Sequence, residues 1–217
     1  MVAITKPFPQ PLPTQDERGV AIARLKLLHA EAEETARLAN LLGRSLHAGI
    51  ALAVLGIVAV GLADDVNPAT QLIWCGLVGA IAAAMLIAYR RAIHKPFERA
   101  VLKDFAKDLS AILLFAGFAW GAGAFLDLPE GTPAAATVVF AAAPAVVIAY
   151  LLRDREALFL FLAPDAALTF AACLMKPYAG GIVAAVLVAC TCAAIAAVTL
   201  YLSRTAAASR PAMLSLP

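Results

Sequence analysis

Six long apolar runs constrain this chain more than any other feature of its sequence. Each is close to the ~20 residues that a helix needs to cross ~30 Å of hydrocarbon. Lipid admits only helices and closed barrels, because these alone satisfy all their backbone hydrogen bonds, and no alternating strand pattern occurs. We therefore predict an all-α fold, a polytopic membrane protein in which a cytoplasmic amphipathic helix precedes six transmembrane helices. The spans are expected at about 46–63, 72–89, 110–127, 134–152, 157–175 and 180–203.

Composition supports a membrane protein and argues against an enzyme. Of the 217 residues, 63% are hydrophobic, and a soluble domain of that length has no core large enough to bury so much apolar surface. All four cysteines lie inside apolar runs, and the spacing of Cys190 and Cys192 suits neither a metal site nor a redox pair. No H-E-x-x-H, G-x-S-x-G or P-loop motif occurs. We expect no catalytic residue, no metal site, no cofactor and no nucleic-acid partner.

A charged but periodic segment precedes the first span. Residues 1–14 form a Pro-rich tail without the apolar region of a signal peptide. Thr14 and Glu17 have the spacing of a capping box, which predicts a helix over 15–45. Its apolar stripe either packs on the protein itself or on the lipid surface, or it contacts a second copy or another partner protein. The members of this stripe are Leu25, Leu28, Ala32, Ala39 and Leu42.

Lysine and arginine predict the orientation in the membrane. Sixteen of the seventeen lie before the first span, between spans two and three, between spans four and five, or after span six, and only Lys176 falls on the other side. The positive-inside rule then places both termini in the cytoplasm. The six spans form a membrane domain over 46–203, followed by a cytoplasmic tail over 204–217. The opposite turns carry Asp64, Asp65, Asp127 and Glu130 instead of cations.

The link between the second and third spans, over 90–109, is amphipathic. Its cations alternate with apolar residues at four-residue steps, which predicts a segment in the membrane interface with its cations near anionic headgroups. Pro96 marks the expected break between the second span and this segment. The apolar positions are Ile93, Phe97, Val101, Phe105 and Leu109.

One ionisable residue, Asp165, lies deep inside a predicted span. A carboxylate at that depth costs several kcal/mol unless it is paired, hydrated or protonated. Pro164, just before it, leaves the carbonyl of Leu160 without a helical N–H. Pro164 and Asp165 together predict a polar notch in an apolar helix. The notch either locks two helices together through a hydrogen bond or binds a ligand, a proton or an ion.

Small residues at four-residue spacing predict close helix packing, within the chain or between two copies. Trp74 and Trp120 lie near predicted span ends, which is typical of aromatic residues that anchor in the membrane interface. The small residues are Gly117 and Gly121 in the third span and Gly76 and Ala80 in the second.

Three segments carry a family resemblance: RLKLLHAEAEETARLANLLGRSL before the first span, YRRAIHKPFERA after the second, and LSAILLFAGFAWGAGAFL in the third. Over about residues 20–203 the chain resembles the six-helix membrane sensor region at the N-termini of many bacterial diguanylate cyclases and sensor histidine kinases. The resemblance implies a bacterial inner-membrane location and a role in passing a membrane signal to a cytoplasmic output. No cyclase or kinase sequence follows Tyr201, so the enzymatic output is not implied.

These features lead to one hypothesis and two alternatives. The chain is expected to be a non-enzymatic sensory or regulatory module that signals through the helix over 15–45, as a homodimer or through a separate signalling partner. Alternatively, it is a small transporter or channel subunit that uses Asp165, or an accessory subunit of a larger membrane complex. Under each of these hypotheses the chain lies in a lipid bilayer.

Overall fold

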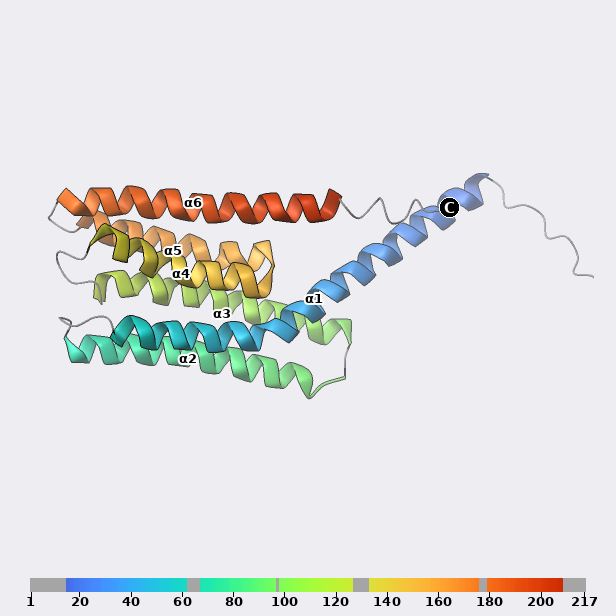
Figure 1. Cartoon of the computed structure of the whole chain (residues 1–217). Coiled ribbons are helices and arrows are strands. Elements are labelled where there is room, and N and C mark those ends of the chain that lie inside the picture. Colours follow the sequence, from blue (N-terminus) through green and yellow to red (C-terminus); the bar gives the residue numbers. More distant parts are fainter. Residues whose placement is uncertain (1–14, 62–66, 97, 127–132, 176–178, 209–217) are drawn as a thin grey trace, which may run out of the picture. The chain divides into compact units, whose positions relative to one another are not determined.

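The computed structural model describes residues 15–61, 67–96, 98–126, 133–175 and 179–208. Within these residues the chain forms six helices that are long and apolar enough to cross a membrane (Figure 1). The prediction of an all-α chain with six such helices is confirmed. The helices are α1 (Gln15–Gly61), α2 (Pro68–Ile93), α3 (Arg99–Leu126), α4 (Ala134–Leu152), α5 (Arg155–Met175) and α6 (Ala179–Ala208).

The chain divides into two units, Met1–Arg37 and Leu38–Pro217. The second unit, here called the bundle, begins within α1 at Leu38. Leu38, Leu41 and Leu42 are each less than 8% exposed and belong to the bundle core. The apolar stripe that the sequence assigned to one cytoplasmic helix is therefore shared between the two units.

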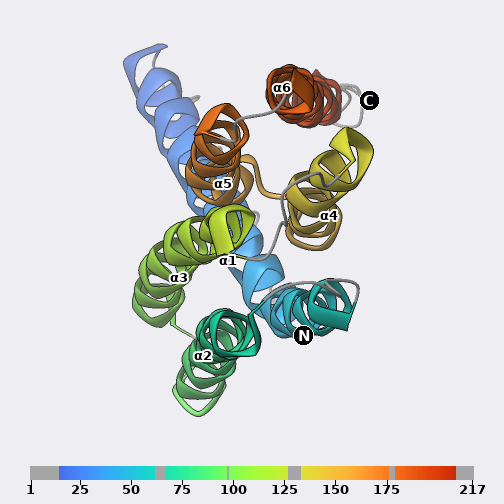
Figure 2. The same ribbon diagram turned by 90° about the vertical axis from the view of Figure 1, so that its left-hand side faces the viewer.

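Within the bundle, α5 packs against α3, α4 and α6, and α3 packs against α2 (Figure 2). The bundle part of α1 packs on α2 through glycines. A Cβ atom at Gly56 would lie 2.9 Å from Cγ1 of Val78, and one at Gly49 would lie 3.3 Å from Cβ of Met85. Both distances are tighter than ordinary contacts, so glycine allows α1 to lie directly against α2.

The segment that connects α2 and α3 differs from the sequence prediction. Helix α2 begins at Pro68, where the side chain of Asn67 accepts a hydrogen bond from the N–H of Ala69 (3.0 Å). It ends at Ile93, before Pro96, and residues 99–109 are continuous with the third predicted span as the first turns of α3. Three of their apolar side chains belong to the bundle core: Leu102, Phe105 and Leu109. Phe97 lies outside the described residues.

Helices α4 and α5 are joined by two residues only, Arg153 and Asp154. Arg153 has a left-handed backbone (φ 51°), the one positive φ at a non-glycine residue in the described part of the chain. Its guanidinium lies 5.8 Å from the centre of the Tyr150 ring. Asp154 accepts a hydrogen bond from the N–H of Ala157 (3.0 Å) and so caps α5. The tight turn is thus stabilised on both sides.

The α2–α3 and α4–α5 connections lie at the same end of the bundle (Figure 1). The cations of both connections therefore share one end, here called the cationic end. It includes Arg90, Arg91, Lys95, Arg153 and Arg155. The four acidic residues predicted for the opposite turns lie outside the described residues.

Candidate functional site

The centre of α5 carries a polar notch. Pro164 lies inside the helix and has no N–H to donate to the carbonyl of Leu160. Asp165 follows it, and Thr169 lies one turn further on the same face. The side chains of Asp165 and Thr169 are both 0% exposed. These two polar side chains therefore point into the bundle.

The carboxyl group of Asp165 has one satisfied and one unsatisfied oxygen. The hydroxyl of Thr169 donates to Oδ1 over 3.4 Å, a long hydrogen bond. The other oxygen, Oδ2, is buried and has no hydrogen-bond partner within the described part of the chain. An unpaired buried polar atom costs roughly 1–3 kcal/mol. Such an atom in a membrane bundle is a candidate site for a proton, a cation or a hydrogen-bond donor.

Helix α3 closes the notch from one side. A Cβ atom at Gly121 would lie 2.9 Å from the carbonyl oxygen of Asp165. One at Gly117 would lie 2.7 Å from Cγ of Pro164 and would collide with the carbonyl of Phe161. The G-x-x-x-G pair thus brings the backbone of α3 against the backbone of α5 at the residues that form the notch. The sequence singled out these two motifs separately, and the structure brings them together.

Helix α6 packs against α5, and Cys192 on α6 is 6% exposed. Cys190, two residues earlier, is exposed, in keeping with the opposite directions expected from their spacing. The helix that carries the notch is therefore packed against α3 and α6.

The sequence analysis did not predict a cluster of three aromatic side chains in the bundle core. The rings of Trp74, Trp120 and Phe140 lie 5.2–5.8 Å apart between centroids. The indole N–H of Trp120 donates to the carbonyl oxygen of Phe140 (2.8 Å). That carbonyl lies four residues before Pro144, which has no N–H, so the indole replaces a missing helical hydrogen bond.

The interpretation of the two tryptophans as interfacial anchors was wrong. Trp74 is 0% exposed and Trp120 is 3% exposed, and the indole N–H of Trp74 donates to the carbonyl of Ala119 (2.9 Å). Both side chains are core residues because each finds a backbone acceptor on a neighbouring helix. The signal that could have revealed this role is Pro144, whose position implies a free carbonyl one turn earlier.

The small residues of α2 are placed differently from those of α3. Gly76 and Ala80 are exposed, and a Cβ atom at Gly76 would meet nothing within 4 Å. Gly76 therefore makes no close helix contact within the described chain, and Ala80 lines a hollow between α2 and α3.

The predicted contact stripe is split. Leu25, Leu28 and Ala32 are exposed, Ala39 is half-buried, and Leu42 is 4% exposed in the bundle core. Of the five residues, Leu25, Leu28 and Ala32 are therefore the ones that remain open to a partner, whereas the side chain of Leu42 is covered by the bundle.

Among the described residues, no three His, Cys, Asp or Glu side chains come together as a metal site requires. Comparison of the chain with models of known protein families, with curated proteins and with solved structures finds no match.

Proposed function

We propose that the chain is a membrane sensory or regulatory module of a bacterial inner membrane, with both termini in the cytoplasm. In this proposal the polar notch at Asp165 receives the signal, and the exposed stripe of α1 passes it to a second copy of the chain. The observation that carries the proposal is the unpaired carboxyl oxygen of Asp165, a residue whose backbone lies against Gly121 in the close α3–α5 contact.

The notch is suited to convert binding into helix movement. A proton or a hydrogen-bond donor that satisfies Oδ2 changes the interactions of Asp165 by an amount comparable with a buried hydrogen bond, about 1–3 kcal/mol. The backbones of α3 and α5 touch at this position, so there is no free space beside the notch in which a change in shape could be accommodated. A small event at Asp165 is therefore expected to move α5 relative to α3.

The exposed part of α1 is suited to pass the signal on. Leu25 and Leu28 are 66% and 56% exposed on a helix that also carries many charges. Apolar side chains at this spacing form the seam of a two-helix contact. Because Met1–Arg37 forms a unit of its own, a second copy of the chain can cover this stripe without disturbing the bundle core.

The test measures association between two differently labelled copies by energy transfer in lipid vesicles. Leu28→Glu should lower the transfer strongly, whereas Leu27→Glu should not. Leu27 is a matched control, since it is 64% exposed but lies on another face of the helix. Asp165→Asn should also change the transfer, although the bundle stays folded. Unchanged transfer in both Leu28→Glu and Asp165→Asn would contradict the proposal.

A second candidate function is a small transporter or channel subunit in which Asp165 binds a proton or a cation. The same unpaired oxygen favours it. Flux of protons or monovalent cations into vesicles that contain the purified chain separates the two functions. Flux that Asp165→Asn abolishes, together with unchanged energy transfer, would establish the transporter alternative.

A third candidate is an accessory subunit of a larger membrane complex. It is favoured by the exposed small-residue face of α2 at Gly76 and Ala80, where another helix can approach closely. Co-purification that Gly76→Leu abolishes, with a partner present in stoichiometric amount, would support this alternative over a homodimer through α1.

A further inference from the structure

Two hollows lie between α2 and α3. One, at the cationic end, has a volume of about 340 Å³ and is lined by apolar and charged side chains, among them Ala88 and Phe105. The other is larger, about 590 Å³, and is lined by apolar side chains, among them Ala84 and Phe115. Neither hollow includes the polar notch.

The two hollows belong to one groove. On α2 the lining residues continue at steps of three and four from Leu77 through Ala84 and Ala88 to Lys95. On α3 they continue in the same way from Val101 through the second hollow. Residues at these steps share one face of a helix. A single groove therefore runs along the α2–α3 pair, charged at one end and apolar along the rest.

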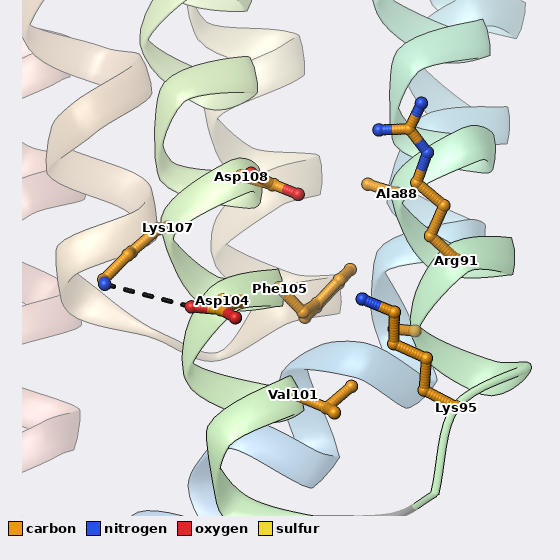
Figure 3. A pocket seen from close by; sticks show the side chains of 9 residues that line it. Ala88, Arg91, Lys95, Val101, Asp104, Phe105, Lys107 and Asp108 are labelled. Atoms are coloured by element: carbon orange, nitrogen blue, oxygen red, sulfur yellow. Dashed lines mark ion pairs between the residues drawn. The ribbon is translucent and has the colours of Figure 1, made fainter.

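The charged end of the groove presents free cations (Figure 3). Lys107 lies on the side of α3 away from α2 and pairs with Asp104 over 3.9 Å. Arg91 and Lys95 extend from α2, and neither forms an ion pair with any residue that the structure describes. Asp108 extends from α3 toward α2. Three cations and two carboxylates thus line this end, which leaves one net positive charge.

The apolar part of the groove has the length of one lipid leaflet. Leu77 lies eleven residues before Ala88 in α2, which corresponds to about 16 Å at 1.5 Å per residue. Half of a hydrocarbon core of ~30 Å is about 15 Å. An acyl chain that begins at the cationic end would therefore reach the middle of the membrane at the far end of the groove.

We infer that this groove binds one phospholipid, with its phosphate at Arg91 and Lys95 and an acyl chain along the apolar trough between α2 and α3. The single net positive charge matches a phosphodiester headgroup, which carries one negative charge. A phosphate monoester would bring up to two charges beside the carboxylates of Asp104 and Asp108. Basic pockets between transmembrane helices are a known form of headgroup site.

The first experiment tests the headgroup. Binding of phosphatidylglycerol to the full chain in detergent is measured by native mass spectrometry, with phosphatidylcholine for comparison. Arg91→Gln and Lys95→Gln should each weaken phosphatidylglycerol binding about fivefold, and the double variant about 25-fold. Arg90→Gln is the matched control, because the helical period places Arg90 on the opposite face of α2. Equal loss in Arg90→Gln and the double variant would overturn the inference.

The second experiment tests the acyl chain. Ala84→Leu fills the trough and should reduce phosphatidylglycerol binding, whereas Ala83→Leu, on an exposed face outside the groove, should not. Inorganic phosphate at millimolar concentration should not displace the lipid, since it has no chain to bury. Displacement by phosphate would identify a site for a soluble anion and overturn the inference. So would an Ala84→Leu variant that changes the oligomeric state but not lipid binding, because the groove would then hold a second copy.

Discussion

Helix α3 meets its neighbours α5 and α2 in opposite ways. Toward α5 it presents Gly117 and Gly121, and the two backbones touch. Toward α2 it presents Phe115 and Phe118, and a groove stays open although α2 offers small residues there. The difference teaches that small residues on one helix are not enough to bring two helix backbones together. The facing helix must offer a surface that allows its backbone to approach as well.

The largest expected effect is at the closed contact. Gly121→Leu forces a side chain into the backbone of Asp165 and the Cβ of Leu168, so it should lower the free energy of unfolding by about 3 kcal/mol. Unfolding in mixed micelles, followed by the fluorescence of the two buried tryptophans, measures this change.

The control for this prediction is Ala80→Leu on the open side. Ala80 is exposed and lines the groove that stays open between α2 and α3, so the free energy of unfolding should change by no more than about 0.5 kcal/mol. Similar losses in both variants would show that the contrast between the two sides of α3 does not govern stability.

The contact between α3 and α4 is expected to be intermediate. Trp120→Phe removes the only described hydrogen-bond donor to the carbonyl of Phe140 and should cost about 2 kcal/mol. Trp74→Phe removes the same volume, but the carbonyl of Ala119 keeps the helical N–H of Gly123, so its cost should be about 1 kcal/mol lower. Thermal unfolding in detergent, followed by size-exclusion chromatography, compares the two variants. Equal costs would mean that Pro144 leaves no carbonyl in need of a donor.

The smallest effect is expected at the notch itself. Asp165→Asn keeps the shape of the side chain and retains an acceptor for Thr169, so the free energy of unfolding should change by less than about 1 kcal/mol. This variant shows whether the α3–α5 contact is held by its shape or by the carboxyl group. A loss as large as that of Gly121→Leu would assign the contact to the carboxyl group. Mixed-micelle unfolding again provides the measurement.

The number and approximate extent of the apolar helices could be predicted from the sequence, because the thickness of a bilayer sets the length of each apolar run. The span predicted at 134–152 coincides with α4, which is bounded by Pro133 and Arg153. Helix α2 is longer than its predicted span, since Asn67 caps it at one end and its last turn accommodates two arginines that complement the helix dipole. A helix can thus continue through polar and charged residues beyond the apolar run from which it was predicted.

The partners of each helix could not be predicted in the same way. Residue types indicated a buried carboxylate at Asp165 and a close approach at Gly121, but not that the two would meet. Their meeting depends on which helices are neighbours, and apolar runs of similar length do not encode that order. The tryptophans were misinterpreted for a related reason: a general preference for the membrane interface was weighed above the specific carbonyl that Pro144 leaves free.

The two-residue turn at Arg153 and Asp154 has a consequence for biogenesis. A connection of two residues is too short to span the bilayer. Helices α4 and α5 therefore have to enter the membrane together as a helical hairpin. Asp165 is then carried into the bilayer already attached to a strongly apolar helix, which offsets the cost of transferring its carboxyl group from water. Because α5 precedes α6 in the chain, this hairpin is inserted before α6 can pack against α5.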